Sequence, residues 1–353
     1  MILPILGLTY IGWHLWTLVP LSAAWRSMLI GMLIGSFLLL FCNLGRVIDS
    51  MPMWLARLVY DIGNSSVFIM LYLTIIFLVL DLGRVLHIVS RQLLHQNFYT
   101  TAVIAIGLFA VFIYGNIHYQ HKTREELALK SDKPLARPMK LVLMSDLHLG
   151  YHNPRKELAR WVDMINAEKP DMVLIAGDII DMSMRPLLEE NMAEERRRIE
   201  APVYACLGNH EYYSGEPDAQ RFYYDARINL LQDSCVTAGD LCIIGRDDRT
   251  NMRRMPIKEL AQKADLSKYT ILLDHQPYRL EEAEKAGIDF QFSGHTHHGQ
   301  VWPISWITEQ VYECAFGRHQ RGDTQYYVSS GIGIWGGKYR IGTRSEYVVA
   351  TIQ

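Results

Sequence analysis

The sequence predicts an α/β fold for its second half, preceded by a helical membrane region, and two observations support this division. Residues up to about 117 are overwhelmingly apolar, whereas charged residues are frequent in the rest of the 353-residue chain. In the second half, short apolar runs alternate with segments of helical spacing, as in α/β domains. We expect a transmembrane domain over residues 1–118, a linker over 119–139 and a soluble domain over 140–353.

Four apolar stretches in the first half approach the roughly 20 residues that cross a bilayer core. They cover residues 2–19, 28–44, 67–89 and 102–117. We interpret them as four transmembrane helices that anchor the chain. A cleaved signal peptide is the alternative for the first stretch, because small residues follow it at 22–24, but no basic segment precedes it.

The basic residues predict which side of the membrane carries the soluble domain. With an even number of spans, the loop with Arg46 and Arg57 lies on the same side as the segment after the fourth stretch, which has five basic residues. Arg26, Arg84 and Arg91 lie on the opposite side. The positive-inside rule therefore favours an inner-membrane protein with a cytoplasmic soluble domain. Five scattered cysteines without pairing motifs agree with a reducing compartment.

The soluble domain is predicted to begin with a buried strand from Leu141 that ends at Asp146, His148 and Gly150. Side chains two apart at the end of a strand leave the same face. A carboxylate and an imidazole so placed suit a borderline metal ion, and the carboxyl ends of strands are where α/β folds collect their sites. Taken alone, such a tripeptide is more often a polar turn than a metal site.

The same plan recurs after later strands. Helical spacing over 154–168 is followed by an apolar run over 172–176, and the parallel strand–helix–strand unit brings Asp178 to the sheet edge of Asp146. Further strands are predicted at 202–207, 241–244, 269–273 and 290–292, a short outer strand near 127–129, and helices at 186–199 and 257–264. The metal-competent residues after these later strands are Asn209, His210, Glu211, His275, His295, His297 and His298.

One histidine after a strand is usually a hydrogen-bonded turn residue, but the repetition indicates a shared site. The ordered set of Asp146-Leu-His148, Gly177-Asp178, Gly208-Asn209-His210-Glu211, His275 and Gly294-His295-Thr296-His297 resembles the calcineurin-like metallophosphoesterases. The resemblance covers residues 140–353. Gly331-Ile332-Gly333, Arg340 and Glu346 further resemble the membrane-associated YkuE-like and YaeI-like phosphodiesterases. His298 departs from that subgroup, which commonly has a glycine there.

The resemblance implies a four-layer α/β/β/α sandwich with a two-metal centre. It implies that one metal is held by Asp146, His148 and His297. It assigns the second metal to Asn209, His275 and His295, with Asp178 as the bridging ligand. Mixed carboxylate, imidazole and amide ligands suit manganese, iron or zinc, and we favour manganese. Two such ions share one hydroxide that attacks the phosphorus in line.

The resemblance also suggests roles around the metals. His210 is expected to donate a proton to the leaving oxygen or to stabilise its charge. Asp181 either orients that imidazole or is a simple turn carboxylate. Glu211 and His298 are candidates for contacts with the substrate or with the residues that hold the metal ligands. Arg340 either meets a phosphate or forms a surface salt bridge.

The leading hypothesis is a membrane-anchored phosphoesterase that cleaves a phosphodiester or pyrophosphate bond. Because the tether holds the domain at a bilayer, the substrate is expected to be lipid-linked, and relatives suggest UDP-2,3-diacylglucosamine. One alternative is a phosphomonoesterase or nucleotide phosphodiesterase with a soluble substrate. Another is a non-catalytic metal-binding sensor or scaffold, which the complete ligand set disfavours. The near-neutral net charge of −2 gives no indication of a nucleic-acid partner, and the sequence does not indicate an oligomeric state.

Overall fold

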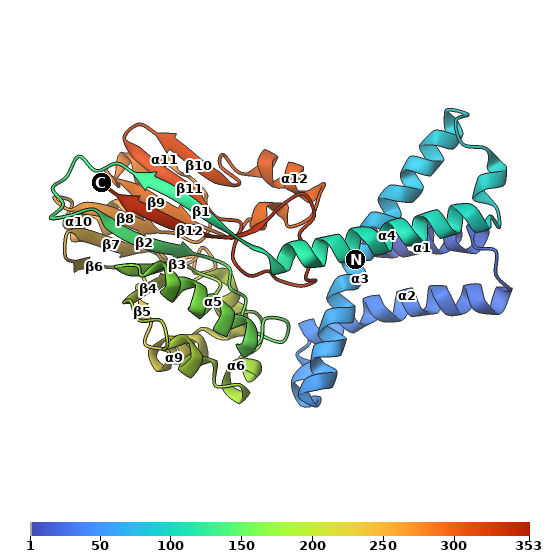
Figure 1. Ribbon diagram of the computed structural model, residues 1–353, viewed down its shortest axis with the longest axis horizontal. Coiled ribbons are helices and arrows are strands. Elements are labelled where there is room, and N and C mark those ends of the chain that lie inside the picture. Colours follow the sequence, from blue (N-terminus) through green and yellow to red (C-terminus); the bar gives the residue numbers. More distant parts are fainter. Residues whose placement is uncertain (1) are drawn as a thin grey trace. The chain divides into compact units, whose positions relative to one another are not determined.

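The computed structural model describes residues 2–353, and side-chain surroundings from residue 4 onward. The chain forms two compact units (Figure 1). The helical unit contains the residues up to 117 together with 336–338, and the catalytic unit contains 118–335 and 339–353.

The helical unit contains four α-helices and two short 3-10 turns. Their bounds are α1 Ile2–Leu18, α2 Ala23–Leu44, η1 Val47–Ser50, α3 Met53–Val85, η2 Arg91–Leu94 and α4 Phe98–Gln120. Three of these helices, α2, α3 and α4, are long and apolar enough to cross a membrane. Helices α2 and α4 extend beyond the stretches expected from the sequence, whereas α3 begins well before its expected stretch and ends at Val85, before the expected end near residue 89.

The prediction of four membrane-crossing helices is wrong for the first stretch. Helix α1 has 17 residues, which at a rise of about 1.5 Å per residue is shorter than the bilayer core of about 30 Å. Pro20 accounts for its end, because a proline disfavours helical backbone at the preceding residue. Buried Ile11 of α1 packs in one apolar cluster with buried Phe77 of α3. The described part of the chain thus has three helices of membrane-crossing length.

The catalytic unit is a sandwich of two six-stranded mixed sheets. The first has the order β1-β12-β2-β3-β4-β5 and the second β10-β11-β9-β8-β7-β6. The strands of the first sheet are β1 Lys122–Leu129, β2 Met139–Met144, β3 Met172–Ala176, β4 Val203–Cys206, β5 Asn229–Leu230 and β12 Ser345–Ile352. Those of the second are β6 Ser234–Ala238, β7 Leu241–Gly245, β8 Tyr269–Leu273, β9 Phe290–Ser293, β10 Gly317–Arg321 and β11 Thr324–Val328.

Helices cover the outer face of each sheet, which gives four layers. The helical elements are α5 Arg155–Glu168, α6 Arg185–Glu189, α7 Met192–Arg196, α8 Asn209–Ser214, α9 Glu216–Asp225, α10 Ile257–Lys263, α11 Glu281–Lys285, η3 His297–Gly299 and α12 Ile304–Val311. The predicted helix over 186–199 is divided into α6 and α7, because Asn191 between them adopts a left-handed backbone with φ of 52°.

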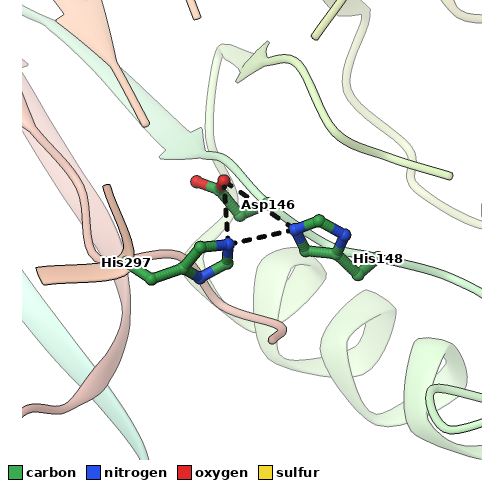
Figure 2. A group of neighbouring side chains, drawn as sticks. All are labelled: Asp146, His148 and His297. Carbon is green, nitrogen blue, oxygen red and sulfur yellow. Dashed lines mark hydrogen bonds and ion pairs between the residues drawn. The ribbon is translucent and has the colours of Figure 1, made fainter. Parts of the chain in front are cut away.

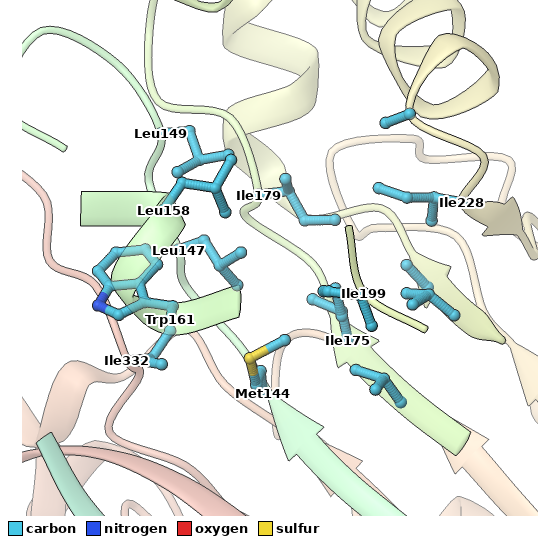
Figure 3. Close-up of a cluster of buried hydrophobic side chains, with 14 of the residues drawn as sticks. Met144, Leu147, Leu149, Leu158, Trp161, Ile175, Ile179, Ile199, Ile228 and Ile332 are labelled. Carbon is cyan, nitrogen blue, oxygen red and sulfur yellow. The ribbon is translucent and has the colours of Figure 1, made fainter. Parts of the chain in front are cut away.

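Strand β2 shows how the sequence builds these layers, since successive side chains of a strand alternate between faces. Leu141 and Leu143 belong to the apolar core between the two sheets. Val142 and Met144 belong to the core between the first sheet and its helices, where they join Trp161 of α5 (Figure 3). A separate apolar cluster lies under α10 and α11 on the second sheet.

Strand direction positions the site. β2, β3 and β4 are mutually parallel, as are β7, β8 and β9. The loops after each set of strands therefore leave from one edge. Strand β1 pairs in parallel with β12 along its whole length, from Lys122↔Ser345 to Leu129↔Ile352. The sequence indicated only its last three residues, because an edge strand tolerates the charges of Arg124 and Glu126.

Candidate metal centre

The loops that follow the parallel strands hold their polar residues in left-handed backbone conformations. The φ angles are 54° at Asp146, 46° at His148, 51° at Asp178, 70° at His295 and 48° at His297. Non-glycine residues in this region cost about 1 kcal/mol or more each and persist where the surrounding structure fixes them. Five such residues in one place indicate that the loops adopt a less stable backbone in order to direct these side chains toward one point.

Two glycines allow these loops to approach one another. A Cβ atom at Gly208 would lie 2.1 Å from Asp178 Oδ1, and one at Gly294 would lie 2.3 Å from Asp146 Oδ2. Both distances are far below contact range, so any other residue at these positions would displace the carboxylates. The glycines thus allow acids of the first sheet to sit against loops of either sheet.

One group of metal-competent side chains contains Asp146, His148 and His297, whose donor atoms all lie within 4.8 Å of one another (Figure 2). The Nε2 atoms of His148 and His297 are 3.1 Å apart. Asp146 Oδ1 lies 3.3 Å from His297 Nε2 and 3.9 Å from His148 Nε2. The backbone N–H of His295 donates to the Asp146 carboxylate. All three side chains of the group are buried.

A second group contains Asp178, His275 and His295. Asp178 Oδ2 lies 3.1 Å from His275 Nε2 and 3.7 Å from His148 Nε2, so this oxygen stands between the two groups. His275 Nδ1 lies 2.7 Å from the carbonyl oxygen of Ala176. A proton on Nδ1 leaves the lone pair of Nε2 available to a metal ion, the arrangement common among metal-bound histidines.

The donors present fit divalent metal ions. The side-chain carbonyl oxygen of Asn209 is buried and has no hydrogen-bond partner among the described residues, an arrangement that is costly unless another group is bound there. Burial lowers the pKa of His295 to about 4 and that of His297 well below its usual value. Both imidazoles are therefore neutral at physiological pH, the form that binds metals.

A third group links His148 to His210 through Asp181. Asp181 Oδ1 lies 3.3 Å from Nδ1 of both imidazoles. Burial alone would lower the pKa of His210, but Asp178 and Asp181 raise it to about 9. Burial likewise opposes ionisation of Asp181, yet His148 and His210 hold its pKa well below the usual value. The geometry favours a charged imidazolium paired with a carboxylate.

The two candidates for substrate contact on these loops have protein partners. The buried carboxylate of Glu211 accepts backbone N–H bonds from Gly208 at 2.7 Å, Ile179 at 2.8 Å, Ile180 at 3.0 Å and Asp178 at 3.1 Å. The side chain is 0% exposed, and it clamps the two loops together instead of facing solvent. His298 lies at the rim, where Nε2 is 3.1 Å from Glu309 and the ring stacks on Phe316.

Arg340 lies neither at the surface nor at a position open to a phosphate. Its side chain is 0% exposed and donates to the carbonyl oxygens of His297 at 2.6 Å and Gly333 at 3.2 Å, to that of Ser330, and to Ser345 Oγ at 3.1 Å. Burial lowers its pKa to about 10, so the guanidinium stays charged. A sequence shows a cationic side chain but not these carbonyl partners.

Sequence reasoning missed Asn153. Its side-chain N–H₂ donates to the carbonyl oxygens of Leu147 and His148, both at 3.1 Å. Its side-chain oxygen accepts from the Tyr119 hydroxyl at 2.6 Å. The side chain thus fixes the backbone that carries His148. The available signal was the polar His152-Asn153 pair, only four residues beyond that histidine.

Comparison with known proteins agrees with this geometry. The model of the calcineurin-like phosphoesterase family matches residues 139–299. An uncharacterized metallophosphoesterase of Campylobacter jejuni is 30% identical over 75% of this chain and 72% of its own length. A zebrafish (Danio rerio) transmembrane protein with a metallophosphoesterase domain is 27% identical over 88% of this chain and 76% of its own.

Among solved structures, a 5′-nucleotidase precursor of Thermus thermophilus is 16% identical over 61% of this chain and 55% of its own, with a TM-score of 0.40. That likeness is too low to inform on substrate. The matched family model, the sequence relatives and the paired Asp/His groups agree with one another. The chain belongs to the calcineurin-like phosphoesterase family and is a metallophosphoesterase.

Proposed function

We propose that this chain is a membrane-anchored enzyme that hydrolyses a phosphodiester or pyrophosphate bond in a lipid-linked substrate, of which UDP-2,3-diacylglucosamine is the most concrete example. The observation that carries the reaction class is the position of Asp178 Oδ2 between His275 and His148, members of two separate metal-competent groups. The three helices of membrane-crossing length support a substrate at the bilayer.

In this proposal, Asp146, His148 and His297 hold one divalent ion. Asn209 and His275 hold the other, together with His295, and Asp178 lies between the ions. Two ions so placed would lower the pKa of a shared water and polarise the phosphoryl oxygens. The ligand types suit manganese, iron or zinc, and manganese is favoured.

His210 is the proposed proton donor to the leaving oxygen. Its Nδ1 faces Asp181, which leaves Nε2 for the substrate. About 15% of the imidazole is exposed, more than of either partner in its group, so a substrate can reach it. Asp181 then positions two imidazoles at once, the donor His210 and the metal-competent His148.

The proposal places the catalytic domain, residues 140–353, in the cytoplasm. Arg46, between α2 and α3, and Arg57, near the start of α3, are two membrane crossings from this domain whether or not α1 spans. Basic residues at these positions and after α4 outnumber those at Arg26, Arg84 and Arg91. We also retain the narrower kinship with the YkuE-like and YaeI-like phosphodiesterases. The stretch 119–139, expected as a linker, contains β1 of the first sheet.

The test is hydrolysis by the detergent-solubilised full chain with added Mn²⁺, using bis(p-nitrophenyl) phosphate and a UDP-linked diacyl sugar. Asp178→Asn is expected to reduce turnover of both substrates by roughly 10²-fold or more, because it removes the shared carboxylate. Asp265→Asn is the matched control, because it makes the same substitution in a surface turn. There the carboxylate accepts hydrogen bonds from the backbone N–H and the hydroxyl of Ser267. This variant is expected to leave turnover unchanged.

His210→Ala separates proton donation from metal binding. A nitrophenolate leaves without help, so the variant should lose far less activity on bis(p-nitrophenyl) phosphate than on a dialkyl phosphodiester, whose alkoxide leaving group needs a proton. Equal losses on both would contradict the proton-donor role. Turnover of soluble nucleotides with none of lipid substrates would overturn the lipid assignment and leave the reaction class intact.

A further inference from the structure

Helix α12 has exposed apolar side chains and comes shortly after η3, which begins at His297. The exposed fractions are 59% for Trp306, 61% for Ile307 and 57% for Val311. Ile307 and Val311 are four residues apart and therefore lie on one side of the helix, while Ser305 is buried on the other. Three adjoining large apolar side chains at this exposure mark an interaction surface rather than scattered surface residues.

The start of this helix is fixed to the loop that carries His297 and His298. A Cβ atom at Gly299 would lie 2.3 Å from the backbone nitrogen of Ser305, so the loop and the first turn of α12 are in close backbone contact. Glu309, in the second turn, lies 3.1 Å from His298 Nε2. A displacement of α12 would therefore be transmitted to the metal-competent His297.

The end of the helix is fixed to the second group of metal-competent residues. Tyr312 follows α12 directly, and its ring centroid lies 6.4 Å from that of His295. Its hydroxyl accepts a hydrogen bond from the Tyr278 hydroxyl at 3.0 Å. Helix α12 is thus linked to the loop of His297 at its start and, through the ring contact of Tyr312 with His295, to the second group just past its end, while its apolar side chains are exposed.

We propose that α12 docks on the bilayer surface and presents the metal centre to the headgroup of a lipid substrate. The occupant of the apolar face is lipid, because the same chain carries three helices of membrane-crossing length that hold this domain at a membrane. Tryptophan is the side chain most suited to the boundary between headgroups and acyl chains. A short helix with one apolar face lies in that boundary plane.

This inference rests on the proposed lipid-linked substrate, and its test separates the two. The full chain, with Cys42 and Cys235 replaced by serine to remove the partly exposed thiols, is labelled with the fluorophore NBD at Ile307→Cys and reconstituted in phosphatidylcholine–phosphatidylglycerol nanodiscs. The matched control carries the label at Leu188→Cys, because Leu188 of α6 is similarly exposed at 63%.

The proposal predicts blue-shifted emission at position 307 that lipids with doxyl-labelled chains quench, and neither effect at 188. Emission at 307 like that at 188 would overturn it. A blue shift without quenching would overturn it too, since the face would then be covered by protein, such as a second copy of this chain. Quenching at 307 in an enzyme that cleaves no lipid substrate would keep the docking helix and refute the substrate class.

A functional arm uses the triple variant Trp306→Gln, Ile307→Gln, Val311→Gln in the same nanodiscs. We expect kcat/KM for the lipid-linked substrate to fall about tenfold, because apolar area that holds the site at the bilayer is lost. Turnover of bis(p-nitrophenyl) phosphate is expected to stay unchanged, which also shows that the variant is folded. Equal kcat/KM on the lipid substrate for variant and wild type would contradict the role of this face.

Discussion

The loops of the two sheets are held by clamps of opposite charge. On the first sheet, the buried carboxylate of Glu211 accepts four backbone N–H groups from the loops after β3 and β4. On the second sheet, the buried guanidinium of Arg340 donates to the backbone carbonyl oxygen of His297 in the loop after β9. It also donates to Ser330 and Gly333 beyond β11.

The difference shows that the charge of each clamp is opposite to the partial charge of the backbone groups that it binds. The first-sheet loops turn their N–H groups inward toward Glu211, and only an acceptor with several lone pairs can satisfy them. The second-sheet loops turn carbonyl oxygens toward Arg340, and a planar fork of five donors matches that need. Neither charged side chain touches the metal-competent atoms, yet both determine where those atoms lie.

The largest expected effect on stability comes from removing the second-sheet clamp. Arg340→Met would remove the donor to the buried carbonyl oxygens of Ser330 and Gly333, while that of His297 would keep its bond from the Gln300 N–H. We expect a loss of about 4 kcal/mol in the free energy of unfolding. Urea unfolding of the full chain in detergent measures it. Arg221→Met, on a side chain that is 83% exposed, should change little. A loss as small as that of the Arg221 variant would mean that the clamp is not needed.

Arg340→Lys tests whether the charge alone is enough, because lysine keeps the charge but cannot donate to several carbonyl oxygens in fixed directions. Most of the loss is expected to remain with lysine. Full recovery of stability by lysine would show that charge, and not the fork of hydrogen bonds, is what the second sheet requires.

Weakening the first-sheet clamp should reduce the free energy of unfolding by less. Glu211→Gln keeps one acceptor oxygen and sets an N–H₂ group against backbone donors, so we expect a loss of about 2–3 kcal/mol. Glu259→Gln, on an exposed glutamate of α10, provides the matched control. Because Glu211 holds the backbone of Asp178, metal affinity measured by titration should fall in the first variant only. Unchanged metal affinity would show that the clamp does not position the metal-competent residues.

The smallest effect is expected away from both clamps, at Glu168 near the end of α5. Hydrogen bonds from Arg124 of β1 and Lys140 of β2 lower its pKa to about 2. A carboxyl whose pKa falls on folding stabilises the protein above its unfolded pKa, and that contribution disappears as pH falls from about 4.5 toward 2. Glu168→Gln should cost about 1 kcal/mol near neutral pH.

The pH dependence provides the check on this last prediction. The stability difference between wild type and Glu168→Gln should narrow through the acid range when both are followed by urea unfolding. A difference that stays constant with pH would indicate that the residue acts by packing rather than by charge.

How far the sequence predicts the fold depends on what each element buries. The strands at 172–176 and 269–273 have the predicted bounds, because strands buried on both faces are continuous apolar runs. Strand β10, Gly317–Arg321, was not predicted, since its residues are polar and its partner β11 supplies the pairing. Helix α1 ends only one residue before the predicted end of its stretch, so the error there was to count a run of this length as a membrane crossing.

For the site, the order of residues along the chain predicted which loops carry metal-competent side chains. It did not predict the clamps, because hydrogen bonds to backbone groups leave no pattern in side-chain types. For that reason Arg340 was expected either near a phosphate or in a surface salt bridge, and its role in holding loop backbone was not predicted. The shared position of Asp181, close to two imidazoles, likewise depends on how the loop after β3 turns back toward His148.

The most direct test of the central claim, that loops of both sheets build one two-metal centre, is the metal content of the full chain. Protein loaded with Mn²⁺ and freed of excess ion is analysed by inductively coupled plasma mass spectrometry, beside His295→Ala. The account predicts two ions per chain in the wild type and loss of about one in the variant, because His295 belongs only to the second group. A single ion in the wild type, unaffected by the substitution, would contradict it.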